Sequence, residues 1–375
     1  MKTVLFIFGT RPELIKLNPL IKKYKSDPTY KTIVCITSQH KELLHDLFQL
    51  FDFTYDYDLS IMDENQTLVG SFNKIVTRLN ELHFETKPSL IFVQGDTTSA
   101  FAGSLFGYYN AIKVVHIEAG LRSGDINSPY PEEGNRKMIA TIASYHFCPT
   151  TMAYQNLINE NYQGNMYIVG NTVIDSLAYM VSKVNAEKVK YNRFFTDNQI
   201  SQTSKKILIT AHRRENYGEH LNQICDSISQ LSDSFQDVEF IVLLHPNKNG
   251  EFIKSALANI KNVKLLKPVA YDYLVFLLLE SSILMTDSGG IQEEAIYCNK
   301  PILVLRENTE RQEVIEVGAG ILTYNKKDII VEQVTKLLLN SDSYNQMINK
   351  KNPYGDGKSS EYIFNILDEM HFKSN

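Results

Sequence analysis

Short apolar runs alternate with stretches of helical periodicity along the whole chain. The runs are rich in Val, Ile, Leu and Phe, and their apolar residues follow one another without alternating with polar ones. Strands that are covered on both faces have this pattern, so it predicts parallel strands joined by helices in an α/β fold. We predict strands at residues 3–8, 32–37, 90–93, 113–117, 145–148, 206–210, 240–245, 263–266, 283–286 and 302–306.

A polar stretch over residues 183–204 interrupts this pattern. It is rich in Lys, Asn, Gln and Thr and has few apolar anchors. We therefore place a domain boundary between Gly170 and Lys205, with one α/β domain over residues 1–170 and a second over residues 171–357. A chain of 375 residues is long enough for two such domains, each with its own core.

A last helix is predicted after a segment dense in turn residues, 352–357. Ser359 or Ser360 can cap this helix. Its apolar face consists of Ile363, Ile366, Leu367 and Met370. This spacing is typical of a helix that covers a core with one side.

Composition narrows the classes of function. The net charge of −5 gives no reason to expect nucleic-acid binding, so an anionic ligand would be held by local positive groups. No apolar run approaches the ~20 residues of a membrane span, and the first apolar run is too short for a signal peptide. The four cysteines form neither a metal spacing nor a disulfide framework, which fits a reducing cytoplasm.

The most informative segment follows the predicted strand at residues 283–286. It contains Ser288, Gly289 and Gly290 and then opens a helix that includes Glu294. Paired glycines let phosphates approach the backbone, and the N–H groups of the new helix point at them. A carboxylate one turn later repels phosphate but suits the hydroxyls of a ribose. The segment indicates a diphosphate-and-sugar site, and the alternative is an ordinary turn between a strand and a helix.

The turn after the first strand has a related pattern. Gly9 permits a tight turn, and Pro12 suits the first turn of a helix. Arg11 and Lys16 add positive charge at the N-terminus of that helix, where backbone N–H groups already favour anions. A second anion site is therefore predicted here, against the alternative of a surface helix with ordinary basic residues.

Three acidic positions follow strand ends or the loop beside them. Asp96 leaves the strand at 90–93, Glu118 leaves the strand at 113–117, and Glu132 lies in the loop before Arg136. Carboxylates that share one site push their pKa values apart, which provides both an acid and a base near neutral pH. Helix capping explains a single strand-end Asp more simply, but three acids in one domain favour chemistry.

The second domain offers positive groups after its first strand. His212 and Arg213 lie at this strand end, followed by Asn216, and they could clamp a leaving diphosphate. Arg306 begins a further polar segment after the last predicted strand. Because parallel α/β sheets bind ligands at the carboxyl ends of their strands, we expect the two domains to face one cleft.

The sequence lacks the common motifs for binding dinucleotides, nucleoside triphosphates and metal ions. No G-x-G-x-x-G follows a strand, no phosphate-binding P-loop occurs, and no H-E-x-x-H or Cys/His cluster suggests a metal. We therefore expect neither a nicotinamide cofactor nor a metal ion.

Taken in order, the motifs resemble those of the non-hydrolysing UDP-N-acetylglucosamine 2-epimerases. The matching segments are FGTRPELIK, VQGDTTSA, HIEAGLRSGD, PYPEEGNR, HFCPT, VGNTVID, TAHRREN, TDSGGIQEEA, RENTERQE and NPYGDG. They extend from residue 8 to residue 357, essentially the whole chain.

The resemblance implies a GT-B-like arrangement of two Rossmann-like domains, with the helix at 359–375 packing on the first domain and the second binding UDP. It implies a cytoplasmic homodimer that interconverts UDP-GlcNAc and UDP-ManNAc without a cofactor, for cell-surface polysaccharides. The reaction would eliminate UDP to give 2-acetamidoglucal and then add UDP back.

The same resemblance implies a catalytic or a substrate-binding role for each candidate residue. Catalytic roles fall to Asp96, Glu118, Glu132 and His212, and contacts with the substrate fall to Arg11, Lys16, Arg136, Arg213, Asn216, Ser288, Gly289, Gly290, Glu294 and Arg306.

Four other functions stay open. The chain could epimerise a different UDP-2-acetamido sugar, or be a GT-B glycosyltransferase with the same nucleotide site. It could release free ManNAc by hydrolysis, or sense a nucleotide sugar without catalysis.

Overall fold

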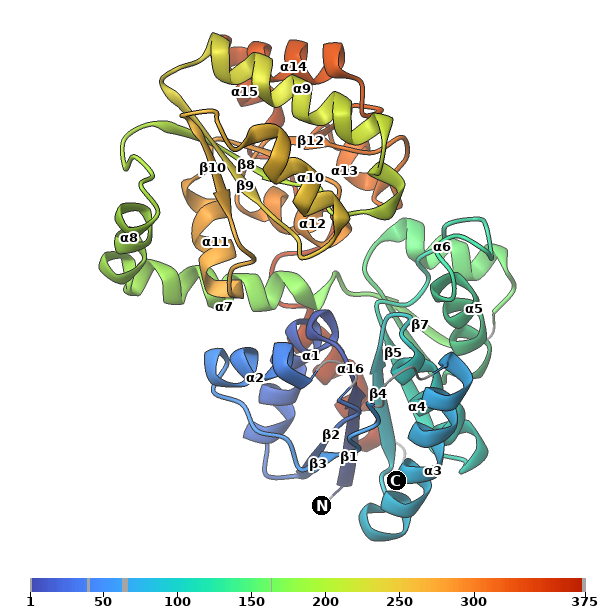
Figure 1. Cartoon of the computed structure of the whole chain (residues 1–375). Helices are drawn as coiled ribbons and strands as arrows, with labels where there is room; N and C mark the ends of the chain where they lie inside the picture. Colours follow the sequence, from blue (N-terminus) through green and yellow to red (C-terminus); the bar gives the residue numbers. More distant parts are fainter. Residues whose placement is uncertain (1, 39–40, 63–66, 163, 373–375) are drawn as a thin grey trace. The chain divides into compact units, whose positions relative to one another are not determined.

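The computed structural model describes residues 2–38, 41–62, 67–162 and 164–372. The chain forms two compact units, and each is a parallel sheet with helices (Figure 1). Unit 1 comprises Met1–Ser176 and Tyr354–Asn375, and unit 2 comprises Leu177–Pro353. The chain therefore leaves unit 1 once and returns to it near its end.

Unit 1 is built on a seven-stranded sheet in the order β3-β2-β1-β4-β5-β6-β7. Its strands are β1 Lys2–Phe8, β2 Tyr30–Ile36, β3 Tyr57–Asp58, β4 Leu90–Gln94, β5 Lys113–Ile117, β6 Tyr145–Cys148 and β7 Asn165–Ile168. All the strand pairs are parallel. The predicted strands of this unit are confirmed to within two residues. We missed β3 and β7, because these short edge strands are partly exposed and lack a continuous apolar run.

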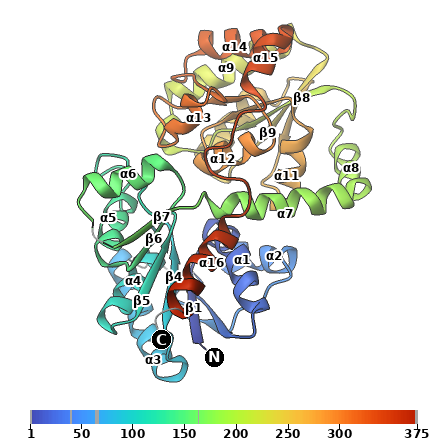
Figure 2. The same ribbon diagram turned by 180° about the vertical axis from the view of Figure 1, so that it is seen from behind.

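The helices of unit 1 are α1 Arg11–Ser26, α2 Lys41–Leu50, α3 Leu68–Thr86, α4 Thr98–Tyr109, α5 Glu132–Ile142, α6 Thr151–Asn159, the start of α7 Thr172–Ala186, and α16 Ser359–Phe372. The last helix, α16, packs beside α1, as Figure 2 shows from behind. The rings of Tyr24 and Phe364 join the two helices with centroids 4.9 Å apart. Buried Tyr24 also contacts Phe6 and Phe92 of the sheet, so α16 completes the core of unit 1.

Unit 2 has a six-stranded parallel sheet in the order β10-β9-β8-β11-β12-β13. Its strands are β8 Lys205–Thr210, β9 Val238–Leu243, β10 Val263–Leu266, β11 Ile283–Thr286, β12 Ile302–Val304 and β13 Gly320–Leu322. The helices are α8 Lys188–Asp197, the 3-10 helix η1 Arg214–Asn216, α9 Glu219–Ser234, α10 Lys248–Leu257, α11 Tyr271–Glu280, α12 Gly289–Tyr297, α13 Gln312–Glu316, α14 Lys327–Leu339 and α15 Ser341–Met347.

The polar stretch at 183–204, near which we placed the domain boundary, is mostly helical. Helix α7 continues into it, and α8 occupies most of the rest. Tyr191 and Phe195 are buried one helical turn apart on α8 and pack against the ring of Phe276. The hydroxyl of Tyr191 also donates to Asp272 at 3.0 Å. Aromatic anchors at helical spacing thus hold a helix in a segment that is otherwise polar.

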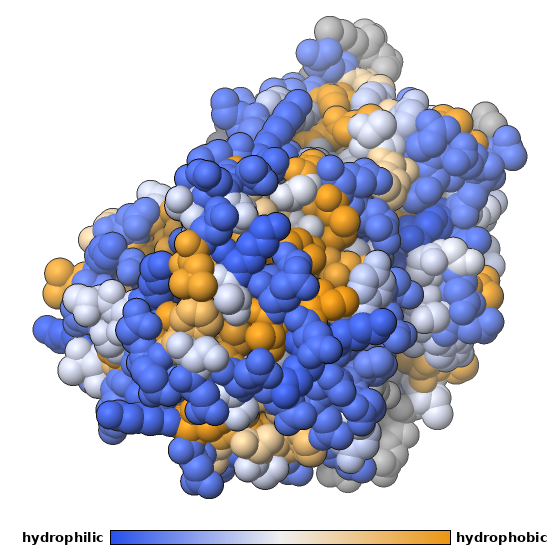
Figure 3. Space-filling view, turned by 90° about the horizontal axis from the view of Figure 1, so that it is seen from above, coloured by the Kyte–Doolittle hydropathy of each residue, from blue (hydrophilic) through white to orange (hydrophobic). Residues whose placement is uncertain are grey.

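Within the described parts of the chain, no helix combines the length and hydrophobicity that crossing a membrane requires. On the face drawn in Figure 3, hydrophobic residues form small groups among hydrophilic ones.

The packing of α16 can be tested at Leu367, which is completely buried. Replacing a buried Leu with Ala typically costs about 2–5 kcal/mol, because it removes apolar contacts and leaves a cavity. We expect Leu367→Ala to lower the urea midpoint of unfolding clearly. Asn365→Ala, at an exposed position of the same helix, should leave the midpoint nearly unchanged. Equal midpoints for the two variants would contradict the packing described for α16.

Candidate active site

Candidate residues follow the strands at which the strand order of each sheet reverses. Strand order reverses between β1 and β4 in unit 1, and between β8 and β11 in unit 2. Open parallel sheets bind ligands outside the carboxyl ends of their strands at such points. Arg11 follows β1 and Asp96 follows β4, while His212 follows β8 and Ser288 follows β11. Each unit therefore has one switch point lined by residues that the sequence had singled out.

In unit 1, a buried carboxylate holds the turn after β1. Glu13 accepts hydrogen bonds from the N–H groups of Gly9 at 3.1 Å and Thr10 at 2.8 Å, and from the Thr10 hydroxyl at 2.7 Å. Its other oxygen accepts the hydroxyl of Thr97 at 2.7 Å. Glu13 thus ties the turn that precedes Arg11 to the loop that carries Asp96. We did not predict this role, although Thr10-x-x-Glu13 has the pattern of a capping box.

Asp96 is held by side chains from α5. Nη2 of Arg136 lies 2.6 Å from Oδ2 of Asp96, and Nη1 of Arg136 lies 2.8 Å from the buried carboxylate of Glu133. The amide of Asn135 donates to the backbone carbonyl of Asp96 at 2.8 Å. The segment 132–136 therefore fixes both the backbone and the charge of the acid after β4.

Charge coupling joins the three predicted acids. Burial raises the pKa of Asp96, Arg136 opposes this rise, and the negative charges of Glu118 and Glu132 add to it. Oε2 of Glu132 is buried and has no hydrogen-bond partner among the described residues. A buried carboxyl oxygen without a partner is able to accept a hydrogen bond from a ligand. These are properties that acid–base chemistry requires.

Glu118 lies deepest in this group, with 8% of its surface exposed. Its Oε2 is bound by the Nζ of Lys16 and by the side-chain amide of Asn171, the latter at 2.7 Å. Its backbone has a φ of 62°, in the left-handed region that residues with a Cβ rarely adopt. Such strain persists only where surrounding contacts hold it, and it is common at functional sites.

In unit 2, Asp287 organises the loop after β8. This carboxylate is completely buried, and its Oδ2 accepts the N–H groups of His212 at 2.7 Å and Arg213 at 2.8 Å. Its Oδ1 lies 2.9 Å from Nδ1 of the His212 ring. Nε2 of His212 is therefore the ring nitrogen that can face a ligand.

A carboxylate surrounded by arginines lies over the start of α12. Glu310 pairs with Arg213 at 3.0 Å and with Arg306. Burial alone would raise the pKa of Glu310, but Arg311, Arg213 and Arg306 together lower it to about 2. A Cβ placed on Gly289 would lie 3.0 Å from Oε1 of Glu310. A network of paired charges, with Glu310 nearest to Gly289, thus lies beside the glycine turn where we predicted a diphosphate.

Asn216 and Arg306, which we predicted to contact the ligand, are bonded to neighbouring loops in the structure. Asn216 is completely buried, and its amide donates to Asp287 and to the carbonyl of Leu305 and accepts from Asn325. The guanidinium of Arg306 is buried against Glu215 and Glu310. Both residues shape the loops around the turn, so their contribution to binding would be indirect.

Glu294 is buried on α12 and accepts the hydroxyl of Tyr271 at 2.7 Å. This bond gives a fixed orientation to the carboxylate that we assigned to a ribose. Ser288 and Gly290 are half-buried at the start of the same helix.

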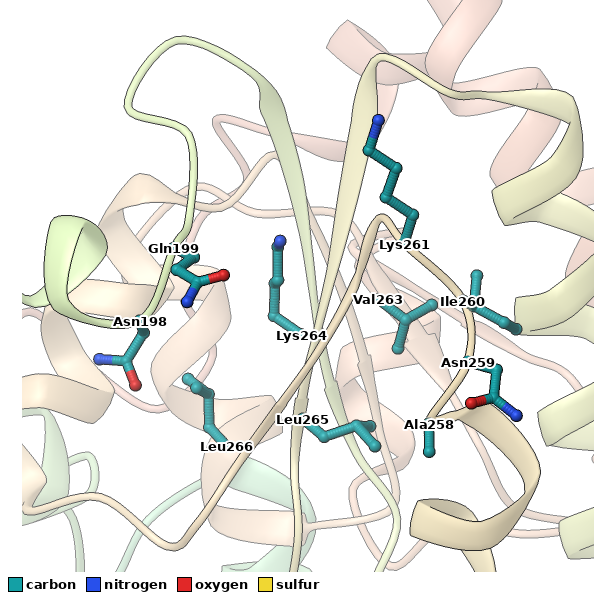
Figure 4. A pocket seen from close by; sticks show the side chains of 10 residues that line it. All are labelled: Asn198, Gln199, Ala258, Asn259, Ile260, Lys261, Val263, Lys264, Leu265 and Leu266. Atoms are coloured by element: carbon teal, nitrogen blue, oxygen red, sulfur yellow. The ribbon is translucent and has the colours of Figure 1, made fainter.

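A separate hollow at the edge of unit 2 contains none of the predicted residues (Figure 4). It lies along β10, with Asn198 and Gln199 on one side and the segment 258–261 on the other. The hollow is therefore distinct from the switch point of this sheet.

Known proteins match the chain over nearly its full length. The family model described as UDP-N-acetylglucosamine 2-epimerase matches residues 22–368. The chain belongs to the UDP-N-acetylglucosamine 2-epimerase family.

Individual members are similar in sequence and structure. The UDP-N-acetylglucosamine 2-epimerase of Campylobacter jejuni is 41% identical, and the alignment covers 98% of this chain and 97% of that protein. The Neisseria meningitidis UDP-GlcNAc 2-epimerase, solved with UDP-GlcNAc bound, has a TM-score of 0.92 and 40% identity, with 98% and 100% coverage. The Methanocaldococcus jannaschii enzyme, in complex with UDP-GlcNAc and UDP, has a TM-score of 0.83 and 33% identity, with 98% and 99% coverage.

These likenesses confirm the fold class predicted from the sequence. The two parallel sheets with alternating helices are those of a GT-B-like member of the 2-epimerase family.

The carboxyl group of Glu13 makes stability depend on pH. Burial raises its pKa from 4.5 to about 7, even though four donors favour the charged form. The folded protein therefore binds this proton more tightly than the unfolded chain, so stability is lost as pH rises through about 7. We expect wild type to lose on the order of 2–3 kcal/mol relative to Glu13→Gln between about pH 5 and about pH 8.

Urea unfolding across this pH range measures the difference between the two proteins. Glu81→Gln, at an exposed position of α3, is the matched control and should follow wild type at every pH. If the difference between wild type and Glu13→Gln did not change with pH, Glu13 would not be the titrating group.

Proposed function

We propose that this chain catalyses the reversible 2-epimerisation of UDP-GlcNAc to UDP-ManNAc. One observation carries the proposal: three coupled acids, Asp96, Glu118 and Glu132, lie at the switch point of unit 1, in a chain whose unit 2 has the glycine turn that we predict to bind a diphosphate. The solved relative from Neisseria meningitidis, with UDP-GlcNAc bound, supports the choice of substrate.

The residues of unit 2 bind the nucleotide. The N–H groups at the start of α12 donate hydrogen bonds to the diphosphate near Ser288 and Gly289, since a helix N-terminus favours anions. The ring of His212 has its Nδ1 2.9 Å from Oδ1 of Asp287, which leaves Nε2 to face the leaving oxygen. Glu294, held by Tyr271, accepts hydrogen bonds from the ribose hydroxyls.

The chemistry depends on how well the diphosphate departs. Carbon 2 of the sugar has no neighbouring carbonyl, so its proton is not acidic in the ground state. As the bond between C1 and the phosphate oxygen breaks, positive charge develops at C1 and acidifies the C2 proton. The electron pair of the C2–H bond forms the C1–C2 double bond of 2-acetamidoglucal, and the pair of the C1–O bond leaves with UDP.

The acids of unit 1 move the proton. One carboxylate removes it from C2, and an acid on the opposite face returns a proton to C2 as UDP adds back to C1. Two different proton affinities are needed for these two steps. The coupling of Asp96 with Glu118 and Glu132 supports this assignment, because it separates the proton affinities of neighbouring carboxyl groups.

Arg11, Lys16 and Arg136 complete the proposed site. Arg11 begins α1 at the same switch point and adds positive charge for the diphosphate. Lys16 and Arg136 balance the charges of Glu118 and Asp96. We further propose a cytoplasmic homodimer that supplies ManNAc-type precursors for surface polysaccharides, on the strength of the family resemblance.

Incubation with UDP-GlcNAc in deuterated water tests the function. We expect UDP-ManNAc to form without any added cofactor or acceptor, with deuterium at C2 of the sugar, because the proton exchanges with solvent between removal and return. NMR spectra of the sugar follow both changes. Free ManNAc would indicate hydrolysis, and an unchanged sugar would contradict the proposed substrate.

Asp96→Asn serves as the companion variant in this experiment. It keeps the shape of the side chain but cannot accept or deliver the proton, so turnover should fall at least about a hundredfold. UDP should still bind within a fewfold of wild-type affinity, because Asp96 is not among the residues that we assign to the nucleotide. Near-normal turnover would remove Asp96 from the proposed mechanism.

A further inference from the structure

Asn171, a residue outside the predicted site, contacts one of the three acids directly. It lies just before α7 and is 2% exposed. Its Nδ2 donates to Oε2 of Glu118 at 2.7 Å, across 53 positions of sequence. The Nζ of Lys16 binds the same oxygen from α1. Two donors from distant parts of the chain therefore converge on one carboxylate oxygen.

The remaining groups of Asn171 fix its own position. Its Oδ1 accepts the N–H of Val173 at 3.2 Å, which is an N-cap bond at the start of α7. Its backbone N–H donates to the carbonyl of Tyr354 at 2.7 Å. The side chain thus has little freedom to turn away from Glu118.

The bond to Tyr354 links Asn171 to the place where the chain re-enters unit 1. The preceding residue, Gly170, has a φ of 84°, and a Cβ there would lie 2.8 Å from the Tyr354 carbonyl oxygen. Asp175 accepts the N–H groups of Ser359 at 3.1 Å and Ser360 at 2.7 Å. The segment that leaves unit 1 and the segment that returns to it are therefore bonded together around Asn171.

The hydrogen bond from Asn171 acts on the charge and the orientation of the Glu118 carboxyl group, together with the other groups around it. The charged and titratable groups that act on Glu118 include Lys16 from α1, Asp96 after β4 and His116 from β5. A hydrogen bond to the ionised form of a carboxyl group favours that form, and a bond to one oxygen fixes the plane of the group. The amide of Asn171 supplies both effects without adding a charge.

We propose that Asn171 is the positioning residue of Glu118: it keeps this carboxylate ionised and oriented for proton transfer, and it couples that orientation to the returning segment at Tyr354. The inference rests on the proposed function for the catalytic role of Glu118. The contact itself belongs to unit 1 and can be tested separately.

Asn171→Ser is the variant that separates catalysis from folding. Serine caps a helix about as well as asparagine, so α7 keeps its N-cap. The shorter side chain cannot reach Glu118, so the donor to Oε2 is lost. We expect kcat to fall roughly tenfold or more with KM within about threefold, since a bond to a charged group is removed. The acidic limb of the pH profile of kcat should move up by about one pH unit.

Two further variants make the result decisive. Asn171→Asp keeps the cap and the length but places a second carboxylate against Glu118, so it should lose more activity than Asn171→Ser. Asn110→Ala removes a bond of the same kind, from Nδ2 to the carbonyl of Phe106 at 2.9 Å, at the end of α4. It should leave kcat and the pH profile unchanged. Equal losses in Asn110→Ala and Asn171→Ser would overturn the inference.

A readout without turnover separates this inference from the proposed function. Protein labelled with isotopic glutamate reports the titration of each carboxyl group by NMR, and Glu118→Gln identifies the signal of Glu118. We expect the midpoint of Glu118 to rise in Asn171→Ser. An unchanged midpoint would overturn the inference even if wild type is active, whereas an inactive wild type with a shifted midpoint would overturn only the substrate assignment.

Discussion

A buried carboxylate keeps its charge only if the fold brings donors to it, and this requirement organises both units of the chain. In unit 1, Glu118 is bound by Lys16 from α1 and by Asn171 from the start of α7. In unit 2, Asp287 collects backbone N–H groups from the loop after β8. The cost of burying each charge is offset by contacts that join segments far apart in sequence. The same contacts fix the side chains that chemistry would use.

The two switch points divide the work of the proposed reaction. Unit 2 presents the backbone N–H groups at the start of α12, where Gly289 lies, and these suit a group that leaves with negative charge. Unit 1 concentrates acids whose proton affinities are set by one another. Proton transfer at C2 and departure of UDP from C1 are linked by the chemistry of the sugar.

Much of this arrangement could be predicted from the sequence. Continuous apolar runs gave most strands, and the strand-end motifs gave Arg11, Asp96, His212 and Ser288. Short edge strands such as β13 carry too few apolar residues to be detected. The helix at Lys188–Asp197 packs through aromatic residues whose partner lies on α11. Its polar composition alone therefore did not predict a packed helix.

The supporting residues could not be predicted in the same way. Asn171 and Asp287 act through tertiary contacts, and nothing in their local sequence identifies the partner. Asn216 stood in a polar motif and suggested a ligand contact, but the structure uses its amide to join loops. Residue type and strand-end position thus locate a site, whereas folding decides which side chains face a ligand and which hold those that do.

The central claim is that the bond between C1 and the diphosphate breaks during epimerisation. UDP-GlcNAc carrying a heavy oxygen isotope in that bridging position tests it most directly. The account predicts that the label spreads to the non-bridging oxygens of the β-phosphate while UDP-ManNAc forms, because free UDP can rotate before it adds back. A label that stays in the bridge throughout complete epimerisation would contradict the account.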